Sequence, residues 1–219
     1  FPLLKSYEYF QASKSVIFYS PVQSLDMENP RVLLTGGNGF IGSHILSLLL
    51  DKSVFVHAVV RSEEKAARVR RDFPCADKSK LDFSVVPDMT VEGAFDKCIQ
   101  ESQPLDIIIH TASPFNYSLY KEASQYLGPA LQGTLEILKS ATKYAPSLKR
   151  LVITGSFSAI GNPLDLQGNG VLYTSDSWNP ITMEQATNGD ANLAYWGSKT
   201  FAERAGQCDT YETIMPGVF

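Results

Sequence analysis

The sequence is poor in cysteine, which narrows the classes of protein that it could belong to. It has three cysteines in 219 residues, Cys75, Cys98 and Cys208, and their spacing matches neither a metal site nor a disulfide framework. We therefore expect free thiols in a reducing compartment, the cytoplasm, and no bound metal.

Long apolar runs and an excess of basic residues are also missing. The longest apolar stretches, such as Ile45–Leu50, are far shorter than the roughly 20 residues that a transmembrane helix needs. The formal net charge is -4, whereas proteins that bind nucleic acid typically have an excess of basic residues. We therefore expect neither a membrane nor a nucleic acid as a partner, and the composition predicts nothing about the oligomeric state.

Residues 1–26 have no regular periodicity. They contain aromatic residues without helical or strand spacing, and the first methionine, Met27, shortly precedes an evident strand. The segment also lacks the apolar core of a secretory signal. We expect residues 1–26 to be an extension outside the fold that is dispensable for stability and cofactor affinity, and residues 27–219 to form one folded domain.

From residue 31 onward, short and largely apolar runs alternate with longer stretches of helical periodicity. The expected strands are Arg31–Thr35, Val54–Val60, Leu81–Val86, Leu105–His110, Lys149–Thr154 and Tyr211–Met215. The expected helices are Phe40–Asp51, Ser62–Phe73, Val91–Glu101, Leu119–Tyr144 and Ala191–Gln207, and residues 161–189 are expected to form a long loop. This alternation predicts an α/β fold of the Rossmann type, a doubly wound parallel sheet with helices on both faces.

A glycine-rich turn follows the first expected strand and opens the first expected helix. Residues 35–42 read TGGNGFIG, in which two glycine spacings fit, one starting at Gly36 and the other at Gly37. Glycine lets the backbone turn sharply and approach a pyrophosphate, which lies on the N-terminus of the helix. The position of this turn predicts a dinucleotide site. The expected cofactor-binding residues of the turn are Gly36, Asn38, Gly39, Phe40, Ile41 and Gly42.

The end of the second expected strand indicates which dinucleotide binds. An acidic residue there would bind the ribose hydroxyls of NAD and repel a 2′-phosphate. The sequence has Arg61 and Ser62 at this position, with Lys65 one helical turn later. Because guanidinium and ammonium groups bind phosphate well, the sequence predicts NADP(H) as the cofactor.

Tyr195 and Lys199 lie four residues apart in an expected helix, so their side chains share one face. A neighbouring ammonium favours the ionised form of a phenol and prepares it for proton exchange near neutral pH. The hydroxyl-bearing residues Thr154, Ser156 and Ser158 follow the fifth expected strand. Combined with the glycine turn, this pattern predicts a serine–tyrosine–lysine catalytic set, while the three histidines, His44, His57 and His110, are expected to have structural roles.

At these motifs the chain resembles the extended short-chain dehydrogenase/reductases. Segments 110–115 (HTASPF), 128–134 (GPALQGT) and 176–180 (DSWNP) are similar to the branch of dihydroflavonol, cinnamoyl-CoA and methylglyoxal-type ketone reductases, with a fungal character. The resemblance covers residues 30–219 and implies Ser156, Tyr195 and Lys199 as the catalytic residues. Gly155 stands where the family usually has serine, so Ser156 is the only candidate at that site, and Ser158 is the alternative.

The resemblance also implies further contacts with the cofactor. Asp88 and Met89 follow the third expected strand and would face the adenine, and Pro216 would touch the nicotinamide. The loop that would run along the cofactor consists of Thr111, Ala112 and Ser113. Tyr195 and Lys199 would meet the nicotinamide ribose, which Lys199 can hold.

The resemblance implies an NADPH-dependent reductase of ketones or aldehydes, which would also work in reverse as an alcohol dehydrogenase. Its substrate would be a small carbonyl compound or alcohol. The alternatives are an NAD(P)-dependent epimerase or hydroxysteroid-type dehydrogenase, and a catalytically silent dinucleotide-binding module. In the family, the substrate-binding part lies beyond the position of Phe219. We therefore expect the chain as given to bind the cofactor but to turn over substrate weakly.

Overall fold

A five-stranded parallel sheet forms the centre of the molecule. The structure is a computed structural model that describes residues 29–77, 79–113, 123–162, 170–174 and 176–206. The strands are β1 (Arg31–Thr35), β2 (Phe55–Val60), β3 (Leu81–Val85), β4 (Ile107–His110) and β5 (Arg150–Ile153), and their order in the sheet is β3-β2-β1-β4-β5. The expected strand Tyr211–Met215 and the extension 1–26 lie outside the described residues.

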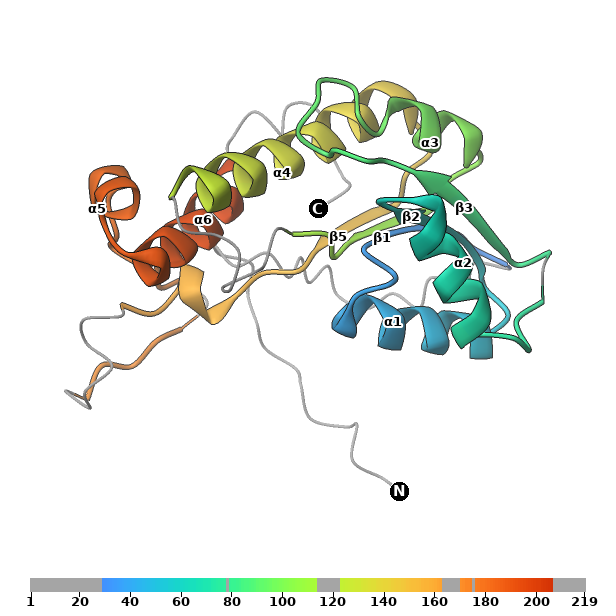
Figure 1. The fold of residues 1–219 in the computed structure, drawn as a ribbon, viewed down its shortest axis with the longest axis horizontal. Coiled ribbons are helices and arrows are strands. Elements are labelled where there is room, and N and C mark those ends of the chain that lie inside the picture. The colour runs from blue at the N-terminus through green and yellow to red at the C-terminus, as the bar shows by residue number, and fades with distance from the viewer. Residues whose placement is uncertain (1–28, 78, 114–122, 163–169, 175, 207–219) are drawn as a thin grey trace.

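Helices cover both faces of this sheet. They are α1 (Phe40–Asp51), α2 (Glu63–Asp72), α3 (Asp96–Glu101), α4 (Ser124–Tyr144), α5 (Met183–Asn188) and α6 (Ala191–Gly206), with a short 3-10 turn, η1 (Phe157–Ala159). Figure 1 shows α1 and α2 on one face of the sheet, α3 and α4 on the other, and α6 beside α4. The Rossmann-type fold that the alternation predicted is therefore confirmed.

The alternation of side chains along β1 explains why the sheet has two hydrophobic cores. Val32 and Leu34 point to the side of α1 and α2, where they pack with Leu46. Leu33 points to the opposite side and packs with Ile137 of α4. Because all of these side chains are almost completely buried, each contributes about 1.5–3 kcal/mol to the hydrophobic stabilisation of the fold.

The structure differs from the expected elements most clearly in two places, and both differences have local causes. Helix α3 begins at Asp96 and not at Val91, because Gly93 adopts a positive φ of 70° that a continuous helix cannot contain. Residues 161–189 are not a loop throughout, since they contain α5. Thr182 and Gln185 form a capping box at its start, in which each side chain accepts a hydrogen bond from the backbone N–H of the other.

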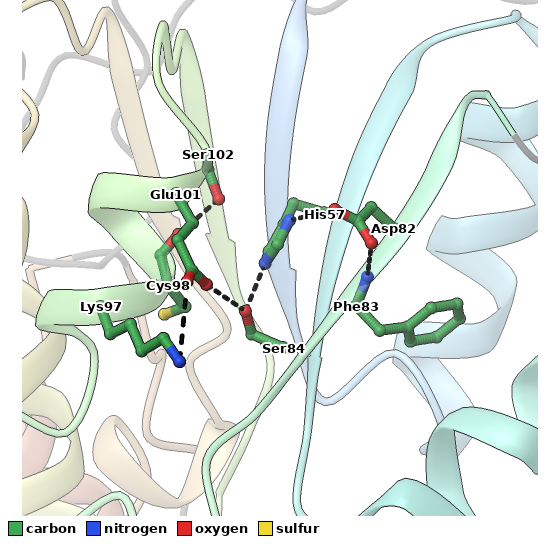
Figure 2. A network of polar contacts seen from close by, with 8 residues as sticks. All are labelled: His57, Asp82, Phe83, Ser84, Lys97, Cys98, Glu101 and Ser102. Atoms are coloured by element: carbon green, nitrogen blue, oxygen red, sulfur yellow. Dashed lines mark hydrogen bonds and ion pairs between the residues drawn. The ribbon is translucent and has the colours of Figure 1, made fainter.

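His57 of β2 is buried and has polar contacts with β3. Its Nε2 lies 2.7 Å from the Ser84 hydroxyl of β3, and that hydroxyl lies 3.5 Å from the carboxylate of Glu101. Figure 2 shows this chain of contacts, together with the Asp82 carboxylate 3.6 Å from Nδ1 of His57. Burial lowers the pKa of His57 below its ordinary value, although Asp82 and Glu101 oppose the shift.

Within the described segments, no helix combines the length and the apolar character needed to cross a bilayer.

Candidate active site and cofactor groove

The carboxyl ends of β1 and β4 form the point at which the order of the strands reverses. The loops that follow these two neighbouring strands leave in different directions, and in doubly wound sheets such a point forms a ligand crevice. Thr35, the last residue of β1, joins the two loops: its carbonyl accepts a 2.6 Å hydrogen bond from Thr111, and its hydroxyl lies 2.9 Å from Nδ1 of His110. A groove of about 560 Å³ opens at this point.

The glycine turn forms one wall of the groove, and its backbone requires glycine at two positions. Gly36 has a φ of 71°, and a Cβ there would lie 2.7 Å from the Thr111 hydroxyl. A Cβ at Gly42 would overlap the carbonyl oxygen of Gly36. Helix α1 begins at Phe40, and its N-cap residue, Gly39, offers no side-chain hydrogen bond. Because the first turn also has no acidic residue, the positive end of the helix can receive a phosphate.

Most of the expected cofactor residues line this one groove. They are Gly36, Asn38, Gly39, Arg61, Asp88, Met89, Thr111, Ala112 and Ser113. The structure places Phe40 and Ile41 apart from that lining, on the exposed first turn of α1, and Gly42 lies beneath the turn. Pro216 lies outside the described residues. Residues that the sequence did not single out as cofactor contacts, including Thr35, Thr90 and Pro129, complete the wall because tertiary packing brings them there.

One end of the groove carries opposite charges. Arg61, Lys65 and Asp88 all line it. Two hydrogen bonds from Thr90, at 2.7 Å from its hydroxyl and 2.8 Å from its backbone N–H, lower the pKa of Asp88, and the charge of Arg61 adds to the effect. This end therefore offers two cations to a phosphate and one ionised carboxylate to a hydrogen-bond donor.

Tyr195 and Lys199 lie on one side of α6, as the spacing predicted. The Nζ atom of Lys199 is 5.6 Å from the centre of the Tyr195 ring, and it donates a 2.6 Å hydrogen bond to the hydroxyl of Ser113. Burial lowers the pKa of Lys199. Tyr126 of α4 meets the Tyr195 ring edge-on, with 6.5 Å between ring centres, and this contact fixes the plane of the phenol. Tyr126 could not be predicted from the sequence, because nothing local links it to α6.

Ser156 stands at the start of η1, directly after β5. Its hydroxyl oxygen accepts a 3.2 Å hydrogen bond from the backbone N–H of Ser158, which leaves the hydroxyl hydrogen able to point to another acceptor. Ser158, the alternative serine, is buried, whereas Ser156 is only half-buried. The turn also contacts the helix of Tyr195, since the hydroxyl of Thr200 shares its hydrogen between the carbonyl of Trp196 at 2.9 Å and the carbonyl of Ser158 at 3.3 Å.

In the part of the chain that the structure describes, no three His, Cys, Asp or Glu side chains gather closely enough to hold a metal ion.

Comparisons with known proteins agree with this arrangement. The model of the NAD dependent epimerase/dehydratase family matches residues 32–183. Ketoreductase azaE of Aspergillus niger is 37% identical over 175 residues, which are 80% of this chain and 50% of that protein. The NADPH-dependent methylglyoxal reductase GRE2 of Saccharomyces cerevisiae is 38% identical over 176 residues, 80% of this chain and 51% of that protein.

Solved structures give the same result at the level of the fold. The crystal structure of yeast methylglyoxal/isovaleraldehyde reductase Gre2 complexed with NADPH superposes with a TM-score of 0.78 at 36% identity. The superposition covers 84% of this chain and 53% of that one. The chain thus spans about half the length of the curated relatives that it matches.

Proposed function

This chain belongs to the NAD dependent epimerase/dehydratase family, and from that premise we propose that it is an NADPH-dependent reductase of ketones or aldehydes that also catalyses the reverse oxidation of alcohols. One observation carries the proposal. Ser113 lines the cofactor groove and also holds the ammonium of Lys199, so the groove leads directly to the helix that carries the tyrosine. A module that only bound a dinucleotide would have no need for this connection.

The groove fits the proposed cofactor. Its glycine wall lets a pyrophosphate approach the start of α1, and the Arg61 end suits a 2′-phosphate. When bound, NADPH supplies the hydride. The chain's own residues would hold it through the Gly36–Gly42 turn, Arg61 and the 111–113 loop, with Ser113 and Lys199 at the nicotinamide end.

The three catalytic residues would act on the oxygen of the substrate carbonyl. Ser156 would donate a hydrogen bond that orients and polarises the carbonyl, and Tyr195 would give its phenol proton to the oxygen as negative charge develops there. The ammonium of Lys199, held by Ser113, would stabilise the phenolate that Tyr195 becomes. In the reverse direction the phenolate takes the proton from the alcohol.

The test is single-turnover reduction by the purified protein, preloaded with NADPH and mixed with small aldehydes and ketones. We expect loss of NADPH absorbance together with formation of one alcohol per cofactor. NADPH binding without consumption by any carbonyl would favour the silent binding module. Conversion of a substrate with no net loss of cofactor would favour the epimerase.

Discrimination between cofactors gives a second test. The Arg61→Ala protein should bind NADPH more weakly by about 1.5–3 kcal/mol, because a charge-assisted contact to the 2′-phosphate is lost, and it should bind NADH as before. Fluorescence titration with both cofactors measures this. The matched control is Arg71→Ala, which removes the same charge from the exposed end of α2. Equal dissociation constants for NADPH and NADH in the unsubstituted protein would rule out the assignment.

The cytoplasm remains our proposal for the location, and it rests on the cysteine content. Cys75 is exposed and Cys98 is buried, and both are free thiols, which suits a reducing compartment. A small carbonyl compound is the proposed substrate partner.

A further inference from the structure

The segment Asp176–Pro180 has a distinctive sequence, yet the reaction as proposed above does not use it. Asn179, its fourth residue, is fully buried. A buried amide is unfavourable unless its polar atoms are hydrogen-bonded, and those of Asn179 are. The side-chain Nδ2 donates to the carbonyl of Ser158 at 2.8 Å, and Oδ1 accepts from the N–H of Ile181 at 2.9 Å. The backbone N–H of Asn179 donates to the carbonyl of Ala159 at 2.8 Å.

Two of these three hydrogen bonds end on η1, the turn that starts at Ser156. Only Phe157 separates Ser156 from Ser158, so a shift of the Ser158 carbonyl is passed directly to the catalytic hydroxyl. Asn179 therefore holds a turn that would otherwise be fixed mainly by its own short-range hydrogen bonds.

The same segment is attached to the helix that carries Tyr195 and Lys199. The guanidinium of Arg204 lies over the ring of Trp178, 5.0 Å from its centre, and donates to the carbonyl of Asn179 at 3.5 Å. Thr200, one turn before Arg204, donates to the Ser158 carbonyl that Asn179 also contacts. The segment and α6 thus meet at one backbone oxygen of the serine turn.

We propose that Asn179 is a positioning residue, which sets the place of the Ser156 hydroxyl relative to Tyr195 by fixing the Ser158 and Ala159 carbonyls of the serine turn to α6. The proposal deepens the proposed function and rests on it. Its chemical consequence lies in the rate of the hydride-transfer step, because a displacement of reacting groups by about 1 Å can cost a factor of about 10². Cofactor binding should change little, since most of the groove lining belongs to the loops after β1, β2, β3 and β4.

The test is a double-mutant cycle with Asn179→Ala and Ser156→Ala, measured by single-turnover reduction. Asn179→Ala should slow the step by about 10- to 100-fold and change the dissociation constant of NADPH by less than about 2-fold. In the Ser156→Ala background the same substitution should cause almost no further loss, because the hydroxyl that it displaces is already gone. The proposal would be overturned if the double variant lost the product of the two single-variant rate factors. It would also be overturned if Asn179→Ala folded and kept an unchanged rate.

Two further measurements keep the outcome decisive. If Asn179→Ala does not fold, Thr200→Val removes the second side-chain contact to the same carbonyl, together with the bond to the Trp196 carbonyl, with little change of shape. It should show a smaller loss with the same dependence on Ser156. Asn188→Ala, at the exposed end of α5, is the matched control and should leave the rate unchanged.

Amide hydrogen exchange of residues 156–161 separates this proposal from the proposed function. It should become faster in Asn179→Ala, or in Thr200→Val, even if the unsubstituted protein reduces no carbonyl, in which case only the proposed function fails. Unchanged exchange would contradict the positioning role itself.

Discussion

Replacing Tyr195 with phenylalanine should slow carbonyl reduction by about 10²–10⁴-fold while leaving NADPH binding nearly unchanged. The substitution removes only the phenol O–H, which is the proposed proton donor. The ring itself keeps its edge-on contact with Tyr126 and its position beside Lys199. Single-turnover reduction measures the chemical step, and fluorescence titration with NADPH measures binding.

Tyr144→Phe provides the control for this substitution. Tyr144 is the last residue of α4 and packs against the core beside α3, so the same loss of a hydroxyl there should leave the rate unchanged. If Tyr195→Phe keeps most of the rate, another group donates the proton and the proposed mechanism is wrong.

Lowering the pH from about 6.5 to 4 should reduce the free energy of unfolding by about 3 kcal/mol through His110 alone. The ring is buried against Phe95, edge to face with 5.9 Å between ring centres, and lies beside Thr35. Burial, with a smaller effect of the Lys199 charge, lowers the pKa of His110 from 6.5 to about 4. Between pH 6.5 and 4, His110 is therefore protonated in the unfolded chain but stays neutral in the folded protein. The free energy of unfolding decreases as the pH falls through this range.

Urea unfolding at a series of pH values between 7 and 4 measures this dependence. His110→Gln should flatten the slope of the free energy of unfolding against pH over this range, whatever its effect on stability at pH 7, because the titrating group is gone. His44→Gln, on the exposed face of α1, is the control and should keep the slope. The remaining slope in His110→Gln should come in part from His57, whose pKa is also lowered by burial. An unchanged slope in His110→Gln would show that His110 is not buried in its neutral form.

Features that depend on neighbours in the chain could be predicted from the sequence. The bounds of β1 and α1 agree with the expected ones, because a short apolar run, a glycine turn and an amphipathic stretch are local signals. The common face of Tyr195 and Lys199 follows from the period of the helix alone. The capping box of α5, at Thr182 and Gln185, is also a local signal, but the turn-forming residues around it hide the helix.

The contacts that join these elements depended on the tertiary structure. The hydrogen bond from Lys199 to Ser113 links residues 86 positions apart, and that from Asn179 to Ser158 links residues 21 apart. Such pairs form because parallel strands end at one edge of the sheet and α6 packs beside them, a placement set by burial of the whole core and not by any local pattern. The sequence by itself therefore determined which chemical groups this protein carries and on which elements. Only the packing of those elements decided that Ser113 accepts the hydrogen bond of Lys199 and that Asn179 bonds to the serine turn.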